Sequence, residues 1–251
     1  MKVRMRAVCS KRLVVSIVSH GHGEDIQRLL SHLALQSAPY IARIVITHNV
    51  PEPALRAPQG GWPFVVQTLH NQMPLGFGAN HNKALLDATE AFICVLNPDV
   101  QLLEGQEPFA ALLHAAAQPH AGCAYPLQVD RQGIVQDSER ELPSPRALWR
   151  RRLLGCSERR TDWVNAACMV LPMSAWKTLK GFDEGYFMYC EDVDLCLRLR
   201  LQGLELIKAP AHVIHAGQRD SHRRLRHLVW HLRSLLRLWT SVAYRRIQSA
   251  K

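Results

Sequence analysis

The sequence predicts an α/β fold, with a mainly parallel sheet flanked by helices and an amphipathic helix near the C-terminal end. Short β-branched runs end at loops rich in glycine, asparagine or proline, and segments with helical spacing of apolar residues lie between them. A chain of 251 residues buries one full-sized core more readily than two. We therefore expect one domain over residues 1–220 and a basic helical extension over residues 221–251.

The first strand is expected at Leu13–Ser19, which ends at a His-Gly-His-Gly loop. Two acids and then apolar residues at helical spacing follow, as they do where a helix begins. Ile41–Thr47 predicts a second buried strand, and the proline-rich segment Pro51–Pro63 predicts a loop.

The next elements continue the alternation. Phe64–Leu69 predicts a third strand, and a helix is expected to begin near Ala79. Ala91–Leu96 predicts a fourth strand, which Asn97-Pro98 ends. Strands and helices that alternate in this way pair mainly in parallel.

The second half of the chain is less regular. Pro143–Cys156 is basic and rich in turn formers, which predicts a mobile loop. The segment Asp192–Gln202 fits two structures, because its LCLRLRL sequence alternates as an exposed strand does. The same segment begins with acids and ends at Gly203, as a helix does.

One long amphipathic helix is expected from Ser221 onward. Its apolar stripe consists of Leu225, Leu228, Val229, Leu232, Leu235, Leu236 and Trp239. Arg223, Arg226, Arg233 and Arg237 lie opposite the stripe. Such a helix can lie in the headgroup plane of an anionic membrane or can pack its stripe on its own domain, and the sequence leaves both open.

The net charge of +10 indicates an anionic partner, which can be a nucleic acid, a phosphorylated substrate or an acidic membrane surface. The excess charge is concentrated at Arg146–Arg152 and near the C-terminal end. No apolar run reaches the ~18 residues of a membrane-spanning helix, and the basic start lacks the apolar stretch of a signal peptide, so we expect a cytoplasmic protein. The seven scattered cysteines form no C-x-x-C pair, which favours buried reduced thiols over a zinc site.

Asp99 follows the fourth strand directly. A carboxylate at the carboxyl end of a parallel strand lies where open α/β sheets bind ligands, and its hard oxygen suits Mg²⁺ or Mn²⁺ bridging to a diphosphate. The alternative is that Asn97-Pro98-Asp99 is only a good turn. His212 or His215 can add a nitrogen ligand from the second half of the chain, and the alternative for each is a solvated or core histidine.

Two further segments have the composition of a site. In Pro74–Lys83 (PLGFGANHNK), Gly76 and Gly78 allow the backbone to approach a ligand closely. The segment Gly181–Asp194 interleaves acids with aromatic residues, which raises carboxyl pKa values and favours a general base. Its acids are Asp183, Glu184, Glu191, Asp192 and Asp194. The alternative is an acidic helix N-terminus.

Taken in order, the segments VSIVSHGHG, LGFGANHNKAL, VLNPDV, DWVNAACMVLP, GFDEGYFMYCEDVDLCLRLRLQG and HVIH resemble the inverting family 2 glycosyltransferases of the GT-A fold, especially the bacterial rhamnosyltransferase-like branch. They span roughly Val14 to His215, and the combination is specific although each segment alone is weak. The resemblance also implies that Asp192–Gln202 is a helix.

The resemblance implies residue roles. Asp99 is similar to the second acid of the family's metal-binding D-x-D motif, with Asn97 in place of the first acid, and His215 resembles the histidine that ligates the same Mg²⁺ or Mn²⁺ ion. Asp192, in the pair Glu191-Asp192, resembles the catalytic base. The implied nucleotide-sugar contacts are Ser19, His20, Asn49, Gly76, Asn80, Asn82, Asn97 and Asp99, and the implied donor-sugar and acceptor contacts are Trp163, Asn165 and Ala166.

The sequence departs from the family at Thr47-His48-Asn49, where a valine-aspartate-asparagine is usual, and at Asn165-Ala166, where a glycine-containing turn is usual. The implied activity is transfer of a sugar such as rhamnose, with inversion, from a dTDP- or UDP-linked donor to a saccharide or polyprenyl-linked acceptor at the inner face of a bacterial membrane. A catalytically degenerate nucleotide-sugar binder is the first alternative, because of His48 and Asn97. A nucleic-acid-binding protein is the second, and the acidic cluster argues against it.

Overall fold

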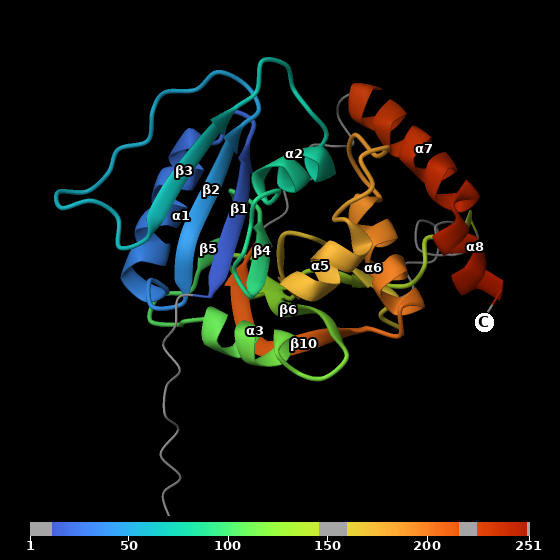
Figure 1. The fold of residues 1–251 in the computed structure, drawn as a ribbon. Coiled ribbons are helices and arrows are strands. Elements are labelled where there is room, and N and C mark those ends of the chain that lie inside the picture. The colour runs from blue at the N-terminus through green and yellow to red at the C-terminus, as the bar shows by residue number, and fades with distance from the viewer. Residues whose placement is uncertain (1–11, 146–159, 216–224, 250–251) are drawn as a thin grey trace, which may run out of the picture.

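The computed structural model describes residues 12–145, 160–215 and 225–249. Its main sheet has eight strands in the order β3-β2-β1-β4-β9-β6-β10-β5 (Figure 1). These strands are β1 (Leu13–Ser19), β2 (Ile41–His48), β3 (Val65–His70), β4 (Phe92–Leu96), β5 (Gln101–Leu102), β6 (Ala121–Val129), β9 (Cys168–Pro172) and β10 (Glu205–Ile214). A separate two-stranded sheet contains β7 (Glu139–Arg140) and β8 (Trp163–Val164).

The helices of the described residues are α1 (Gly23–Gln36), α2 (Phe77–Ala84), α3 (Phe109–Ala116), α5 (Met173–Leu179), α6 (Glu191–Leu201), α7 (Leu225–Thr240) and α8 (Val242–Ser249). The predicted α/β class and the four predicted strands are confirmed, with ends that differ by a residue or so. The helix predicted near Ala79 begins two residues earlier, at Phe77.

The sheet has a switch point beside β1. From β1 the chain moves to β2 and β3 on one side, and it then crosses to β4 on the other side, with all four strands parallel. Ligands of open α/β sheets bind where the strand order reverses, outside the carboxyl ends of the strands. The sheet is mixed further along, because β9 runs antiparallel to both β4 and β6.

Alternating residues of the strands face two different cores. Val15 and Ile17 belong to a core that α1 and α3 close, whereas Val14 belongs to a core on the other face, closed by α2, α5 and α6. Since a strand buried on both faces has no polar side, β4 is a continuous apolar run, and Ser16 alone interrupts the apolar run of β1 before its last residue, Ser19. That pattern explains why these strands could be recognised from the sequence.

Helix α6 settles the ambiguity of Asp192–Gln202. Acids occupy its first turn, and Gly203, with a φ of 73°, follows its end. Leu195 packs into the core that α2, α5 and α6 close against the sheet. Leu197 packs into a third core, which residues of α6, the loop before it, α7 and α8 form. Apolar residues on opposite sides of the helix are thus both buried. The strand-like alternation arises from that double burial.

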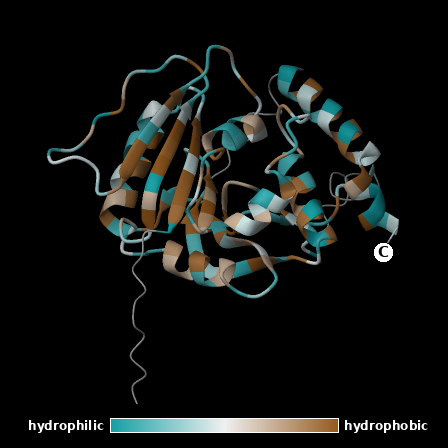
Figure 2. Cartoon of the chain, in the orientation of Figure 1, coloured by the Kyte–Doolittle hydropathy of each residue, from teal (hydrophilic) through white to brown (hydrophobic). Residues whose placement is uncertain are grey.

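The single C-terminal helix predicted from the sequence is two helices, and this prediction was wrong in that respect. The helix is interrupted at Ser241, whose hydroxyl accepts a hydrogen bond from the Tyr244 N–H at 3.1 Å and so caps α8. Leu235, Leu238 and Tyr244 are buried against residues of α6 and the loop before it, in the third core. Figure 2 shows apolar and polar residues mixed along both helices.

Several sequence-based predictions concern residues outside the described ranges: the boundary between residues 220 and 221, the basic run Arg146–Arg152 with most of the loop around it, and the thiols of Cys9 and Cys156. The other cysteines are free and buried, as expected. Within the described part of the chain, none of the helices has the length and hydropathy that crossing a membrane requires.

Candidate active site

Strand pairing brings Asp99 and His215 together. Asp99 lies between β4 and β5, and β5 pairs antiparallel with the end of β10, where Ile214 is opposite Gln101. His215 follows directly, and its Nε2 lies 3.6 Å from the Asp99 Oδ1. Two residues distant in sequence thus meet at the edge of the sheet where β4 ends.

The two side chains have the chemistry of metal ligands. Burial lowers the pKa of His215, against the opposing effect of the Asp99 charge, so the imidazole is neutral at neutral pH. Its Nδ1 lies 2.9 Å from the Gln128 Oε1, which leaves Nε2 facing Asp99. Among the described residues, no group of three or more histidine, cysteine or acidic side chains converges on one point. A cation here would therefore draw its remaining ligands from water, from an amide such as Asn97 and from phosphate oxygens, as Mg²⁺ commonly does.

Glu191 and Asp192 form an acidic pair at the beginning of α6. Burial raises the pKa of Asp192 to about 6, against the hydrogen bonds from the Val193 and Ala166 N–H groups and the charge of Arg140. Burial and then the charge of Asp192 raise the pKa of Glu191 well above its usual range. With a pKa of about 6, Asp192 is ionised at neutral pH, whereas the raised pKa of Glu191 favours its protonated form, and this division of roles suits a general base.

The backbone before the acidic pair is strained. Tyr189 and Cys190 both have positive φ values, of 71° and 65°, a conformation that non-glycine residues rarely adopt. Consecutive left-handed residues turn the chain sharply into α6. Strain of this kind persists where the surroundings impose it, and it is concentrated at functional sites.

The turn between β8 and β9 links the acidic pair to the end of β4. Asp192 accepts a hydrogen bond from the Ala166 N–H, and the next residue, Ala167, accepts one through its carbonyl from the Asn97 N–H at 2.8 Å. The side chain of Asn165 pairs with that of Gln128, the partner of His215. Residues 165–167 therefore connect the acids of α6 with Asn97 and with His215.

Glu52 is a buried carboxylate that sequence reasoning missed. It accepts hydrogen bonds from the Ser19 hydroxyl at 2.7 Å and from the Gly21 N–H at 2.9 Å, and it lies 3.6 Å from the His48 Nδ1. Burial raises the pKa of Glu52, but the hydrogen bonds from Gly21 and Ser19, together with the nearby His48, outweigh that effect and the net pKa is lowered. A carboxylate thus stands beside His48, the residue found where the resemblance expects an aspartate. The only signal in the sequence was an acid between two prolines.

Three of the asparagines expected to line the nucleotide hold loops together. Asn49 exchanges two hydrogen bonds with the backbone of Leu75, and Asn80 is fully buried and donates to the Leu75 carbonyl. Asn82 exchanges two hydrogen bonds with the backbone of Phe182. Their amides already have partners within the protein, while the exposed His20 lies beside Asn49 at the open end of β1.

Gly76 and Gly78, which were expected to let the backbone approach a ligand, lie close to another segment of the chain. A Cβ at Gly76 would lie 2.7 Å from the Phe187 carbonyl oxygen, and one at Gly78 would lie 2.6 Å from the Phe182 Cβ. The Phe77 N–H donates to the same Phe187 carbonyl at 2.9 Å. These contacts press the start of α2 against the segment that leads to the acidic pair.

Trp163 and Arg140 lie on the small sheet beside Asp192. Trp163 is half-buried, donates its indole N–H to the Glu141 carbonyl at 2.9 Å, and carries the Arg140 guanidinium over its ring. Arg140 lies opposite Trp163 in the strand pair and lowers the pKa of Asp192. Sequence reasoning missed Arg140, because it lies in a two-residue strand that has no periodicity.

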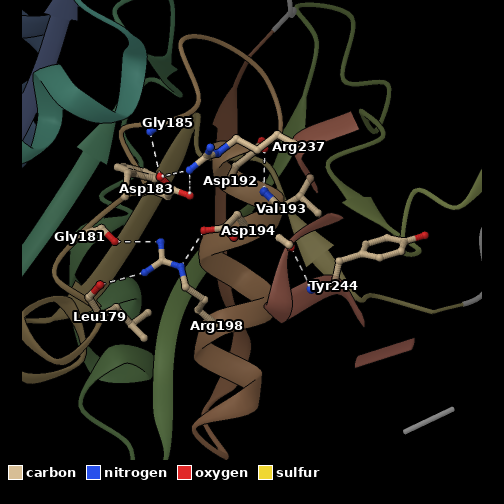
Figure 3. A network of polar contacts seen from close by, with 12 residues as sticks. Leu179, Gly181, Asp183, Gly185, Asp192, Val193, Asp194, Arg198, Arg237 and Tyr244 are labelled. Carbon is tan, nitrogen blue, oxygen red and sulfur yellow. Dashed lines mark hydrogen bonds and ion pairs between the residues drawn. The ribbon is translucent and has the colours of Figure 1, made fainter. Parts of the chain in front are cut away.

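Two acids of the Gly181–Asp194 segment serve to hold its fold. Asp194 pairs with Arg198 at 2.7 Å, and Arg198 also donates to the Leu179 and Gly181 carbonyls (Figure 3). Asp183 pairs with Arg237 of α7 at 2.8 Å (Figure 3). Of the five carboxylates that the sequence grouped together, Asp183 and Asp194 are thus ion-paired structural acids, and Glu184 accepts a hydrogen bond from the Asn82 side chain at 3.0 Å. The remaining two form the pair Glu191-Asp192.

Sequence comparisons found relatives that match most of the chain, although no protein-family model matches it. The chain is 29% identical over 247 residues to Rhamnosyltransferase WbbL of Escherichia coli (strain K12), covering 89% of this chain and 90% of the relative. It is 31% identical over 252 aligned residues to the N-acetylglucosaminyl-diphospho-decaprenol L-rhamnosyltransferase of Mycobacterium tuberculosis (strain CDC 1551 / Oshkosh), covering 86% of this chain and 81% of the relative.

Two solved structures share the fold. The mannosyltransferase PcManGT from Pyrobaculum calidifontis, in complex with GDP-Man and Mn²⁺, has a TM-score of 0.62 at 17% identity, over 90% of this chain and 64% of that chain. Staphylococcus aureus TarS 1-349 in complex with UDP has a TM-score of 0.51 at 15% identity, over 82% of this chain and 58% of that chain. The chain thus spans less than two thirds of each of these structures, and the likeness concerns the fold alone.

Proposed function

Because the chain belongs to the rhamnosyltransferase branch of the family 2 glycosyltransferases, with the GT-A fold, we propose that it transfers rhamnose or a similar sugar, with inversion, in bacterial surface polysaccharide synthesis. The donor is a dTDP- or UDP-linked sugar, and the acceptor is a saccharide carried on a polyprenyl diphosphate. The observation that carries this proposal is the link, through residues 165–167, between the acidic pair of α6 and the strand-end pair Asp99 and His215.

The reaction is a single displacement. The acceptor hydroxyl oxygen attacks the anomeric carbon as the bond from that carbon to the diphosphate oxygen breaks on the opposite face, which inverts the configuration. Asp192 takes the hydroxyl proton, and the raised pKa of its neighbour Glu191 disfavours a second charge beside it. Asp99, His215 and Asn97 would hold Mg²⁺ or Mn²⁺, which supplies positive charge to the departing diphosphate.

The test is a reconstituted transfer assay with purified protein. dTDP-rhamnose and UDP-sugars are supplied in turn with Mn²⁺ and a synthetic N-acetylglucosaminyl-diphospho-polyprenol, and the anomeric configuration of the product is read by NMR. We expect transfer with inversion from one of these donors. Donor binding without transfer or hydrolysis would instead favour the degenerate nucleotide-sugar binder, for which His48 and Asn97 are the motivating departures.

We further propose that α7 lies on an anionic membrane surface, where a polyprenyl-linked acceptor is found. Four apolar side chains of this helix are exposed: Leu228, Val229, Leu232 and Leu236. Arg226 and Arg233 are exposed on the same helix, and the sequence from Leu225 to Ser249 contains no acid. An apolar face flanked by arginines suits the boundary between acyl chains and anionic headgroups.

A further inference from the structure

Behind His215 lies a line of hydrogen-bonded side chains whose link to this histidine neither motif nor family resemblance predicted. Gln128 on β6 is 1% exposed, and its Oε1 lies 2.9 Å from the His215 Nδ1. The backbone fixes this pair, because the His215 N–H donates to the Val129 carbonyl at 2.8 Å. Gln128 in turn forms two hydrogen bonds with the side chain of Asn165.

The orientation of each amide follows from one backbone group whose role is unambiguous. The Ala167 N–H can only donate, and it points to the Asn165 Oδ1 at 3.3 Å. The Gln128 Nε2 donates to the same oxygen at 2.6 Å, and the Asn165 Nδ2 donates to the Gln128 Oε1 at 3.1 Å. Rotating either amide by half a turn would set donor against donor and acceptor against acceptor.

The orientation of Gln128 decides the tautomer of His215. An Oε1 atom only accepts, so the His215 Nδ1 has to carry the hydrogen. In a neutral imidazole the Nε2 then holds a lone pair, and that lone pair faces the Asp99 carboxylate across 3.6 Å. Two electron-rich groups face each other with no hydrogen between them, an arrangement that a cation between them would stabilise.

We propose that Gln128 and Asn165 are positioning residues that hold His215 in its Nδ1–H tautomer, so that Nε2 is free to ligate a divalent cation shared with Asp99. The ligation of a cation by Nε2 rests on the proposed metal-dependent function, whereas the Nδ1–H tautomer does not depend on it. Asn165 thereby receives a role different from the direct sugar contact that the resemblance implied.

The first experiment reads the tautomer in the metal-free protein. Histidine labelled with ¹⁵N gives a pattern of two- and three-bond couplings that separates Nδ1–H from Nε2–H, and the His215→Gln variant identifies the signals. We expect Nδ1–H in the wild type and a shift toward Nε2–H in Gln128→Leu. Asn165→Leu removes both hydrogen bonds to Gln128 and should lose the wild-type pattern. An Nε2–H wild type overturns the proposal.

The second experiment measures Mn²⁺ affinity in the presence of UDP, from the free Mn²⁺ signal in electron paramagnetic resonance. Loss of such a supporting partner lowers metal affinity by about 10–100-fold, and we expect that fall in Gln128→Leu. Gln118→Leu, at an exposed position after α3, is the control and should leave the affinity unchanged. Thermal unfolding checks that each variant is folded. If Gln128→Leu does not fold, Asn165→Leu replaces it in the affinity measurement.

The two experiments separate the two proposals. If Gln128→Leu changes neither the tautomer nor the Mn²⁺ affinity, the positioning role is wrong. If the tautomer changes as expected but the wild-type protein binds no Mn²⁺, the positioning role stands and the metal-dependent mechanism fails.

Discussion

At the scale of single residues, Asp192 and Glu191 are neighbours with opposite expected roles. Asp192→Asn removes the proton acceptor with little change of shape, so we expect transfer to fall by roughly 10²–10⁴-fold while donor binding persists. Burial and the charge of Asp192 favour the protonated form of Glu191, which Glu191→Gln resembles, so this variant should keep most of the activity. Steady-state rates and donor titration of both variants provide the comparison, and a fully active Asp192→Asn would place the base elsewhere.

The raised pKa of Asp192 also predicts a pH dependence of both rate and stability. Since only the carboxylate accepts a proton, kcat/KM should rise as the pH passes through about 6. A folded-state pKa above the unfolded value favours the protonated form, so the stability that Asp192 contributes is full below about pH 4 and is lost as the pH rises through about 6. Between about pH 5 and about pH 8, the free energy of unfolding should therefore fall less in Asp192→Asn than in the wild type, as denaturant unfolding can measure.

How far the sequence predicts these residues depends on what each one contacts. Asp99, Asp192 and His215 could be named in advance because they lie next to recognisable motifs. Arg140 and Gln128 could not, because their roles come from neighbours that strand pairing brings from distant parts of the chain. The amides of Asn49 and Asn80 were expected to contact the nucleotide, and nothing in the sequence distinguishes such a contact from a loop clamp.

At the scale of elements, the two sides of α7 predict different costs of truncation. Leu238 is fully buried in the third core, so Leu238→Ala should destabilise the protein by about 2–5 kcal/mol. Leu236 is 61% exposed on the same helix, and Leu236→Ala should change stability by no more than about 0.5 kcal/mol. Urea unfolding of both variants measures the difference, and equal losses would mean that the helix packs in another orientation.

The exposed side of α7 predicts binding to anionic vesicles. Each basic residue near such a surface contributes about 1 kcal/mol, so the double variant Arg226→Gln, Arg233→Gln should partition about thirtyfold less strongly. Arg237 is left intact because it pairs with Asp183. Flotation with anionic and neutral liposomes gives the measurement. Leu232→Gln, which removes an exposed apolar side chain of α7, should also weaken binding. Leu86→Gln, at a position 79% exposed after α2, is its control and should leave binding unchanged.

Equal recovery of the wild type and the double arginine variant would leave α7 with a purely structural role. The sequence predicted the apolar stripe of this helix but not which part of it is buried. The spacing of apolar residues shows which side of a helix is apolar, but not which part of that side contacts other elements. Leu235 and Leu238 are the buried part, because they pack against α6 and the loop before it. Leu238 lay outside the predicted stripe for that reason.

At the scale of the whole molecule, donor binding should stabilise the fold only when metal is present. A ligand at 100 times its dissociation constant stabilises the native state by about 2.7 kcal/mol, which is a measurable rise in Tm. We expect UDP or dTDP to raise the Tm with Mn²⁺ and to lose that effect in chelator or in Asp99→Ala. A nucleotide effect that is identical with and without metal would contradict the role given to Asp99.

The whole fold was only half visible in the sequence. The four strands from β1 to β4 are short and parallel, and turn residues mark their ends. The strands of the second half gave no comparable signal: β6 contains a proline, β5 has two residues, and β9 enters the sheet antiparallel between β4 and β6. Their order follows from packing across the completed sheet, which no local pattern encodes.

The pairing of β5 with β10 has a consequence in time. Asp99 leaves the ribosome long before His215, and at synthesis rates of roughly 5–20 residues per second the interval lasts on the order of ten seconds. During that interval the emerging polypeptide can assemble the strands from β1 to β4, but Asp99 does not yet have His215 beside it. The proposed metal site therefore forms late in translation, and if activity depends on that site, a nascent chain cannot transfer sugar before β10 has docked.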